Sequence, residues 1–477
     1  MKRLITIIVL LALFINNNCN NSKTEIKPKV GRPRVKKDLQ KIKEEGVLKA
    51  IVVYSGTSYF LYRGQVVGFE YDLLQRLAEY LDLKLQIIVA HNINELITML
   101  NKGKGDIIAH GLTITQDRKE YVNFTDRLYF TRQVLVQRKP AQWRKMTKDE
   151  IQKTLISNPV ELINDTVSVR KNSSYYRRLL NLEEEIGGNI YINTVTGTTS
   201  TGEIIEQVAK GDLEYTVADK NIADIIGSYY PILNSETDIS LSQRIAWAVR
   251  KNSPKLLSAV NNWLNEMKQN KDYYVLYNKY FKNKHNYKDL FQSDFYSRSR
   301  NKISKYDSLI KKHSQKFGWD WRLVSSVIYQ ESQFNPQARS WARARGLMQI
   351  MPRTAGELNI SNVHNPDQNI RGGIQYLEKL SERWTDIPDS IQQLKFTLAS
   401  YNSGYKHIRD GQNLTKKYGE NPQKWDDNVE KYVLKLSFPK YYKDEVVNYG
   451  YARGIETVTY VKQIFKRYEH YTKFIQE

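Results

Sequence analysis

The sequence predicts a multidomain chain in which a two-lobed α/β domain is followed by a mainly α-helical domain. The chain has 477 residues, enough for two or three domains of about 150 residues each. Between residues 45 and 268, short apolar strands alternate with amphipathic helices, whereas the pattern beyond residue 300 is helical. With 40% hydrophobic residues, the chain can bury a core, which excludes a disordered polymer.

In the first domain, one pattern of helix, glycine and strand occurs twice. Residues 71–81 carry leucines at helical spacing, and residues 83–89 alternate as a strand does. Two α/β lobes built on one plan, with a cleft between them, would give this pattern. The predicted strands and helices are a strand over 48–54, a helix over 71–81, a strand over 83–89, a helix over 93–101, a strand over 106–109, a helix through 204–208 and a strand over 215–218.

The amino terminus has the proportions of an export signal. A short basic start is followed by a mostly apolar run from residue 4 to residue 15, which is shorter than the roughly 20 residues that span a bilayer. The only cysteine, Cys19, follows this run, and the segment resembles a bacterial lipoprotein signal, in which such a cysteine carries the lipid. The alternative is an ordinary cleaved signal with an incidental cysteine, because three asparagines precede Cys19.

Charge and composition restrict the partners. The chain has 73 Lys and Arg and 51 Asp and Glu, which gives a net charge of +22. Such a charge suits nucleic acid, anionic lipid or an acidic cell-wall polymer, or it serves solubility alone. No basic helix with interleaved aromatic residues forms a recognition module, so we expect no nucleic-acid partner. One cysteine and seven scattered histidines give no reason to expect a metal or a cofactor.

Polar and charged residues lie at the strand ends of the first domain, in residues 111–118, 122–126 and 172–174. These segments resemble the signature of periplasmic amino-acid-binding proteins. The resemblance implies that Arg118 clamps the α-carboxylate of a ligand through two parallel donors and that Asp219 receives its ammonium group. It also implies three further contacts to the ligand, from Thr113, Ser173 and Ser174. The alternative is a scaffold without a ligand, in which Arg118 pairs with a surface carboxylate and Asp219 caps the helix that follows it.

A carboxylate is expected on the buried face of a helix in the second domain. Val324, Val327 and Ile328 form an apolar stripe on a helix over 321–332, and Glu331 lies seven, four and three residues beyond them, on the same face. Burial and the negative end of the helix would both raise its pKa. A carboxyl group kept protonated near neutral pH is what a glycosidic oxygen needs from a general acid. A salt bridge from Glu331 to a nearby arginine is the alternative.

Short motifs follow one another through this domain. They are, in order, Glu331-Ser332, Asn335-Pro336, Ser340, Gly346-Leu347-Met348-Gln349-Ile350-Met351-Pro352, Ala399-Ser400-Tyr401-Asn402-Ser403-Gly404 and Glu456-Thr457-Val458-Thr459-Tyr460-Val461. The series resembles the motifs of the lytic transglycosylases, goose-lysozyme-like enzymes that cut bacterial peptidoglycan. One departure lies in the loop over 343–346, where the usual Gly-Ala-x-Gly reads Arg-Ala-Arg-Gly, so the shape and charge of this loop remain open.

The resemblance implies a carbon–oxygen lyase that works with one acid. Glu331 would protonate the β-1,4 linkage between MurNAc and GlcNAc and then deprotonate the C6 hydroxyl of the same MurNAc, giving a 1,6-anhydro end. We expect three other acids to be helix-end or surface residues, namely Glu357, Asp367 and Glu378. The resemblance implies substrate contacts from Ser340, Met348, Gln349, Met351, Tyr401, Asn402 and Tyr460. A methionine pair is more often plain core, and Asn402 has the alternative role of a helix cap.

The whole chain resembles a family of membrane-bound transglycosylases that join a solute-binding-like domain to a transglycosylase domain behind a lipoprotein signal. This implies a periplasmic protein on the outer membrane, with peptidoglycan as substrate and a regulatory first domain that senses an amino acid or muropeptide. The alternative is a tethered solute receptor with a non-catalytic wall-binding domain. The predicted boundaries are a signal over 1–19, a basic tether over 20–44, a solute-binding domain over 45–268, a linker over 269–299 and a lysozyme-like domain over 300–477.

Overall fold

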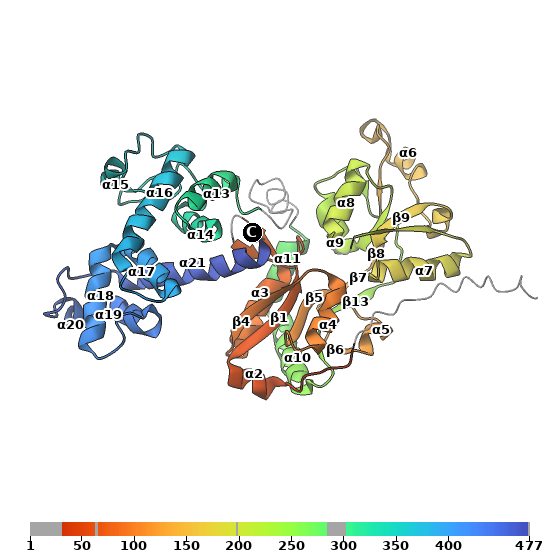
Figure 1. The fold of residues 1–477 in the computed structure, drawn as a ribbon. Helices are drawn as coiled ribbons and strands as arrows, with labels where there is room; N and C mark the ends of the chain where they lie inside the picture. Colours follow the sequence, from red (N-terminus) through yellow and green to blue (C-terminus); the bar gives the residue numbers. More distant parts are fainter. Residues whose placement is uncertain (1–30, 63–64, 197–198, 284–301, 476–477) are drawn as a thin grey trace, which may run out of the picture.

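The computed structural model describes residues 31–62, 65–196, 199–283 and 302–475, so the expected signal and Cys19 lie outside the described residues. Within these ranges the chain forms a two-lobed α/β part, up to residue 283, and a helical part from residue 302 onward (Figure 1). This confirms the predicted fold class. Among the helices of these ranges, none has the length and apolarity to cross a membrane.

The first lobe is built on a sheet with the strand order β4-β1-β5-β13-β6, and β7 also pairs with β13. β1 runs parallel to β4 and β5, whereas β13 is antiparallel to its neighbours. The elements of this lobe are α2 (Leu39–Glu45), β1 (Val47–Val53), β2 (Phe60–Tyr62), β3 (Gln65–Val67), α3 (Phe69–Tyr80), β4 (Lys84–Ala90), η1 (Ile93–Glu95), α4 (Leu96–Asn101), β5 (Ile107–Thr113), α5 (Gln116–Lys119), β6 (Val122–Phe124), β7 (Tyr129–Thr131), β13 (Gln243–Arg250), α10 (Pro254–Gln269) and α11 (Lys271–Phe281).

The second lobe lies between β7 and β13 in the sequence, so the chain crosses from lobe to lobe twice. Its strand β8 pairs with β11 and β12, and β9 pairs in parallel with β10. The elements are β8 (Gln133–Arg138), η2 (Trp143–Lys145), α6 (Lys148–Lys153), η3 (Pro159–Leu162), β9 (Thr166–Arg170), α7 (Ser174–Ile186), β10 (Tyr191–Val195), α8 (Thr201–Lys210), β11 (Thr216–Asp219), α9 (Lys220–Gly227) and β12 (Leu233–Asn234).

The helical part packs around α14, which contacts both α13 and α21. Nine of the twelve residues of α14 are buried, and helices buried on most sides need partners on most sides. The elements are α13 (Asp307–Lys316), α14 (Trp321–Ser332), α15 (Pro352–Glu357), α16 (Pro366–Ser381), η4 (Glu382–Trp384), α17 (Ser390–Ser403), α18 (Tyr405–Lys417), η5 (Trp425–Val429), α19 (Glu430–Lys435), α20 (Pro439–Tyr442) and α21 (Gly454–Phe474).

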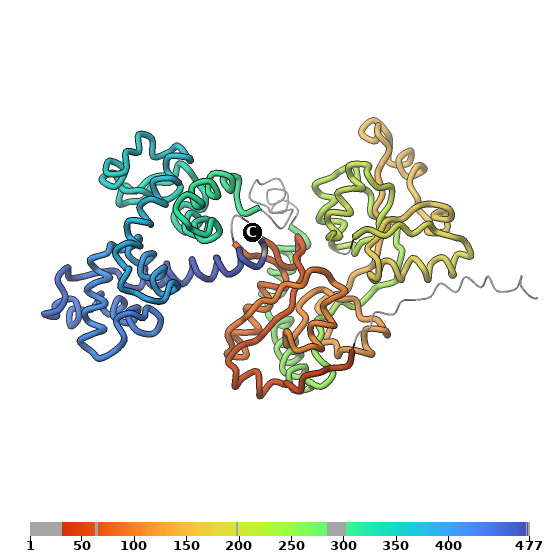
Figure 2. The backbone as a smooth tube through the Cα atoms, viewed as in Figure 1, coloured from red at the N-terminus to blue at the C-terminus, as the bar shows by residue number. Residues whose placement is uncertain are grey.

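The last helix joins the two parts. Figure 2 follows α21 from the helical part to the first lobe, where it meets β3. Near its end, His470 Nδ1 lies 2.8 Å from the phenol oxygen of Tyr59, and the His470 ring meets that of Tyr71 edge-on at 5.8 Å between centroids. One continuous hydrophobic cluster extends through both parts. A buried apolar junction of this kind holds two domains together more firmly than a polar one.

Two of the expected boundaries need correction. The tether was expected to extend to residue 44, but Lys37 is buried, forms ion pairs with Asp106 and Glu45, and precedes helix α2. The linker was expected to begin at residue 269, but α11 packs its buried aromatic face against α3 of the first lobe. Both segments carry side chains that the first lobe buries, and this burial outweighs their polar composition.

Candidate active site and ligand cavity

Glu331 stands on the last turn of α14, as predicted. Asp320 caps this helix by accepting a hydrogen bond from the backbone of Arg322. Val324, Val327 and Ile328 are completely buried on the same helix. The Glu331 side chain keeps an intermediate exposed fraction, yet the burial of its carboxyl group raises the pKa from 4.5 to about 7. An acid with this pKa both gives and takes a proton near neutral pH.

Tyr460 is the direct partner of Glu331. Its phenol donates a hydrogen bond of 2.5 Å to Glu331 Oε1 from the first half of α21. This bond lowers the pKa of Glu331, whereas the charge of Glu456, one turn earlier on α21, raises it. Burial lifts the pKa of Tyr460 itself well above its usual value, so Tyr460 remains a donor. The proximity of Glu456 was not predicted, although its four-residue spacing from Tyr460 places both on one face of a helix.

Tyr401 and Asn402 connect α17 to the segments around Glu331. The Tyr401 phenol donates to the carbonyl oxygen of Met348 at 2.7 Å. The buried phenol of Tyr401 has a pKa well above its usual value, first through burial and then through the charge of Glu331. Asn402 Oδ1 accepts from the Thr457 hydroxyl on α21 at 2.9 Å. The cap of α17 is Gly404, with a φ of 88°, so the alternative role of Asn402 as the cap does not hold.

Ser340 and Gln349 hold the loop that follows α14. The Ser340 hydroxyl oxygen accepts from the backbone of Ala344 at 3.0 Å. The amide of Gln349 donates to the carbonyl oxygens of Ala338 at 3.2 Å and Gly346 at 2.9 Å. The hydroxyl hydrogen of Ser340 and the carbonyl oxygen of Gln349 retain the capacity to meet a sugar.

Met348 and Met351 lie in different surroundings, one buried and one exposed. Met348 is completely buried and packs against Gly373, where any Cβ would collide with it. The expectation that Met348 contacts substrate is therefore wrong for this structure, because a helix glycine opens a core space for its side chain. Met351 is 44% exposed at the start of α15 and is free to contact a substrate.

Arg343 keeps the loop shape that a glycine would give. Its φ is +68°, in the left-handed region that favours glycine. Its neighbour in the loop, Gly346, has a φ of +82° and closely approaches Asn369 and Val363. The departure from the family motif therefore changes the charge of the loop and costs backbone strain, while the turn itself is present.

The three other acids are engaged away from Glu331. Glu357 pairs with Arg353 at 3.0 Å, and Asp367 pairs with His313 at 2.9 Å. Glu378 accepts from the indole of Trp319 at 2.6 Å. These contacts agree with the prediction that the three acids are helix-end or surface residues. In the described ranges, no three histidine, cysteine or acidic side chains gather in an arrangement that could hold a metal.

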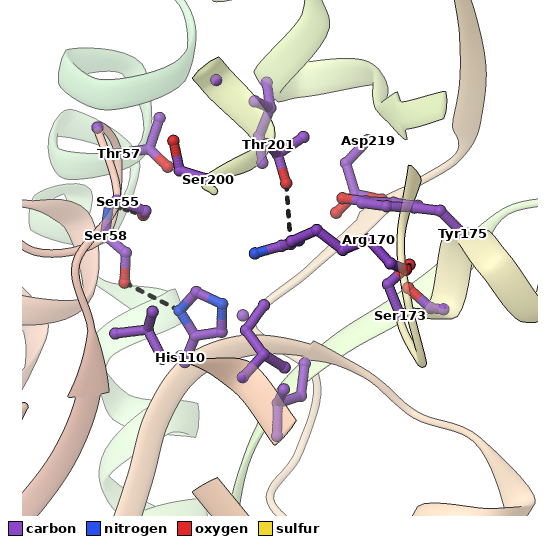
Figure 3. A pocket seen from close by; sticks show the side chains of 18 of the residues that line it. Ser55, Thr57, Ser58, His110, Arg170, Ser173, Tyr175, Ser200, Thr201 and Asp219 are labelled. Atoms are coloured by element: carbon purple, nitrogen blue, oxygen red, sulfur yellow. Dashed lines mark hydrogen bonds between the residues drawn. The ribbon is translucent and has the colours of Figure 1, made fainter. Parts of the chain in front are cut away.

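A cavity of about 330 Å³ lies between the two lobes of the first part, and all five predicted ligand residues line it. Figure 3 labels Ser173 and Asp219 among them. Arg118 donates to the carbonyl oxygen of Thr113 at 2.9 Å, and the Thr113 hydroxyl reaches that of Ser174 across the lobes at 3.5 Å. Ser173 caps α7 by accepting from the backbone of Tyr176. Asp219 begins α9 but makes no side-chain capping bond, which argues against the alternative role proposed for it.

Among the cavity residues that were not predicted are Arg170, His110 and Glu70. Arg170 comes from the end of β9 and donates to the Thr201 hydroxyl at 3.0 Å, as Figure 3 shows. His110 stays neutral, because burial lowers its pKa to about 3. Glu70 lies in the first turn of α3, three, four and seven residues before Leu73, Leu74 and Leu77, so the spacing argument that predicts Glu331 also applies to Glu70.

Two acids of the cavity, Glu70 and Asp219, each have an unsatisfied oxygen. Glu70 Oε2 and Asp219 Oδ1 are buried without a hydrogen-bond partner in the part of the chain that the structure describes. Burial raises the pKa of each acid to about 7. Buried polar atoms are usually paired, so these two oxygens indicate the places where a ligand would donate hydrogen bonds.

Two protein-family models agree with this division. Residues 50–283 match the model for bacterial extracellular solute-binding proteins, family 3, and residues 308–424 match the transglycosylase SLT domain. A crystal structure of a mutant ArgBP from T. maritima aligns at 27% identity, covering 51% of this chain and 98% of its own, with a TM-score of 0.43.

Two relatives match almost the whole chain. Membrane-bound lytic murein transglycosylase F of Desulfosudis oleivorans is 34% identical over 436 residues, which are 91% of this chain and 92% of the relative. Its namesake in Photobacterium profundum is 34% identical over 433 residues, 91% of this chain and 81% of the relative. The chain therefore belongs to the membrane-bound lytic murein transglycosylase F family.

Proposed function

We propose that the chain is a lytic transglycosylase that cleaves the β-1,4 bond between MurNAc and GlcNAc in peptidoglycan. The observation that carries the proposal is the Glu331 carboxyl, held by Tyr460 at 2.5 Å with a pKa of about 7, within the residues that match the transglycosylase domain. A protonated carboxyl of this kind donates to a glycosidic oxygen at the pH of the cell envelope.

In the first step, the Glu331 proton passes to the GlcNAc oxygen as its bond to C1 of MurNAc breaks. The Glu331 carboxylate then takes the proton of the C6 hydroxyl of the same MurNAc, whose oxygen bonds to C1 and closes the 1,6-anhydro ring. The acid returns to its starting form, and no water is consumed. Because the nucleophile is tethered to the reacting sugar, no second carboxylate is required, in contrast to hydrolytic glycosidases.

The neighbours of Glu331 receive distinct roles. Tyr460 orients the carboxyl and, as a permanent donor, stabilises the carboxylate formed after the first step. Tyr401 and Asn402 position the 348 loop and α21 through their bonds to Met348 and Thr457. Substrate contacts are assigned to three side chains around this loop, Ser340, Gln349 and Met351.

We assign the cavity of the first part to a zwitterionic ligand, an amino acid or a muropeptide. Arg118 binds its carboxylate and Asp219 its ammonium, while Ser173 orders the loop beneath them. The unpaired oxygen of Glu70 and the guanidinium of Arg170 add one acceptor and one set of donors. Calorimetry of the full chain with amino acids and stem peptides tests this; saturable binding that Asp219→Asn removes supports it, and heats indistinguishable from dilution contradict it.

Helix α21 offers a route from this cavity to Glu331. Tyr460 contacts Glu331, and His470, ten residues later, contacts Tyr59. Ser58, the neighbour of Tyr59, lines the cavity and bonds His110 at 3.4 Å. A ligand that closes the lobes and binds the closed state more tightly would thereby shift α21. We propose that the first part regulates the second in this way.

The family name places the chain at a membrane, with peptidoglycan as its substrate. We propose that it is a periplasmic lipoprotein of the outer membrane, attached through Cys19. Labelling of the full-length protein with a fatty-acid probe tests this assignment, since replacing Cys19 with serine removes the label if it is correct and leaves it if it is not.

Glu331→Gln tests the proposed reaction. The variant is expected to bind purified sacculi but to release no soluble muropeptides, while the matched variant Glu357→Gln, in an acid paired with Arg353, retains activity. If the folded Glu331→Gln protein cleaves sacculi, the catalytic assignment is wrong. If the wild-type protein binds sacculi without cleaving them, the chain acts as a tethered solute receptor with a wall-binding domain.

A further inference from the structure

Trp341 is an exposed tryptophan beside the candidate active site. Its side chain is 87% exposed, whereas a tryptophan normally buries most of its large surface. It lies in the loop that also contains Ser340 and Gln349. The same loop is fastened beside Glu331, because the Ser332 hydroxyl donates to the carbonyl oxygen of Leu347 at 2.7 Å. An exposed aromatic side chain in such a place is a candidate contact for a ligand.

Arg453 reaches Trp341 from another segment. Its guanidinium carbon lies 5.7 Å from the centroid of the indole ring, in a cation–π contact. Arg453 directly precedes α21 and lies seven residues, about two turns, before Tyr460. Trp341 and Arg453 therefore meet where the two segments that build the surroundings of Glu331 come together. We call this pair the Trp–Arg platform.

The charge around the Trp–Arg platform is strongly positive. Arg339, Arg343 and Arg345 are exposed on the same loop, and none of them forms an ion pair with any residue that the structure describes. Glu456 lies one turn into α21 as the nearby acid. The loop therefore presents guanidinium groups that are free to meet carboxylates of a bound polymer, which Arg binds through parallel donors.

We propose that the Trp–Arg platform is a binding subsite for a peptide-bearing muramyl unit of the glycan strand. The apolar face of the sugar ring would lie on the indole, and Arg453, with Arg343, would bind carboxylates of its peptide. Tryptophan and arginine are the residues that most often dominate a binding surface. The subsite deepens the proposed function, since it names the part of peptidoglycan that the site recognises outside the bond that is cut.

Steady-state kinetics of the full chain on soluble peptide-bearing glycan strands tests the subsite. Trp341→Ala and Arg453→Gln are each expected to raise KM about tenfold while kcat changes by less than about twofold. Arg453→Lys restores part of the affinity. On the same strands after carbodiimide coupling to a neutral amine, which converts carboxylates to amides, Arg453→Gln has no further effect, whereas Trp341→Ala still raises KM.

A matched control is the pair Trp143 and Arg144 in the second lobe, which also makes a cation–π contact, at 5.0 Å. Trp143→Ala and Arg144→Gln leave KM unchanged. An unchanged KM in both platform variants overturns the proposal, as does a fall in kcat alone. So does a loss of binding to anionic vesicles without any change in KM, because the platform would then serve a membrane. These outcomes presuppose that the wild-type protein cuts the strands; if it does not, the proposed function itself fails.

Discussion

Tyr460 holds Glu331 by a hydrogen bond of 2.5 Å between the phenol oxygen and Oε1, although the two residues are 129 positions apart in the chain. The bond joins the end of α14 to α21, the same helix that ends against the first lobe at Tyr59. The acid that carries the proposed chemistry is therefore positioned by the element that also contacts the ligand-binding part.

Replacing Tyr460 with phenylalanine is expected to shift the pH dependence of activity. The hydrogen bond from Tyr460 lowers the pKa of Glu331, which burial has raised to about 7. Without the bond the pKa rises further, so the acid stays protonated to higher pH. We expect kcat/KM of the wild-type protein to fall as the pH rises through about 7, and that fall to move to higher pH in Tyr460→Phe. A fall at an unchanged pH would contradict this role for Tyr460.

Glu331→Gln is expected to make the protein more stable at alkaline pH. The folded protein holds the Glu331 proton with a pKa of about 7, above the unfolded value of 4.5. The resulting stabilisation is complete below pH 4.5 and is lost as the pH rises through 7. Glutamine does not titrate. The free energy of unfolding of the variant, relative to that of the wild type, is therefore expected to rise by about 1–3 kcal/mol from pH 5 to pH 8. Urea unfolding at both pH values measures this gain; an equal difference at both values would argue against a raised pKa.

Arg343→Gly is expected to stabilise the loop. An arginine at a φ of +68° costs about 1 kcal/mol that glycine does not. Part of this gain is offset because glycine has more freedom in the unfolded chain. Thermal unfolding of the wild type and Arg343→Gly measures the difference. A lower midpoint in the variant would mean that the arginine side chain stabilises the loop by more than its backbone strain costs.

His470→Phe is expected to uncouple the two parts. The substitution leaves the Tyr59 hydroxyl, now bonded to His470 at 2.8 Å, without this partner at the junction. Once calorimetry has identified a binding amino acid or stem peptide, its effect on the rate of sacculus cleavage should shrink at least about threefold, which is about 0.7 kcal/mol of coupling. Its affinity for the first part should change less.

The control for this coupling is His313→Phe. His313 is also buried, but it pairs with Asp367 within the helical part. A ligand effect that survives in His470→Phe, or that disappears equally in His313→Phe, would show that the junction at Tyr59 does not carry the signal.

The sequence was sufficient for the elements whose side chains follow a clear period. The strand expected over 48–54 is β1, Val47–Val53, and the helix expected over 71–81 is α3, Phe69–Tyr80. Glu331 was predicted because it follows Val324, Val327 and Ile328 at helical spacing, although the structure buries α14 on most of its sides. Glu70 follows the same rule, but a carboxylate in the first turn of a helix also suits the helix dipole, so its spacing alone does not predict its burial.

Other features depend on contacts between distant segments, which no local pattern reveals. Arg170 enters the cavity where the fold of the second lobe brings the end of β9 and the start of α8 together, and Met348 is buried because a glycine of α16 makes room for it. The tether was predicted too long because Lys37 is buried by pairing with Asp106, far away in the sequence. The linker was predicted too long because the aromatic face of α11 packs against the first lobe. Pairing of this kind offsets the cost of burying a charge.

The central claim, that Glu331 acts alone and the substrate supplies the nucleophile, is tested most directly by digesting purified sacculi in water enriched in ¹⁸O. Mass spectrometry of the released muropeptides then reports how each MurNAc end was formed. The account predicts 1,6-anhydro ends, one water lighter than hydrolysis products and free of ¹⁸O. Reducing ends that carry ¹⁸O would contradict it, because a water molecule would then have attacked C1.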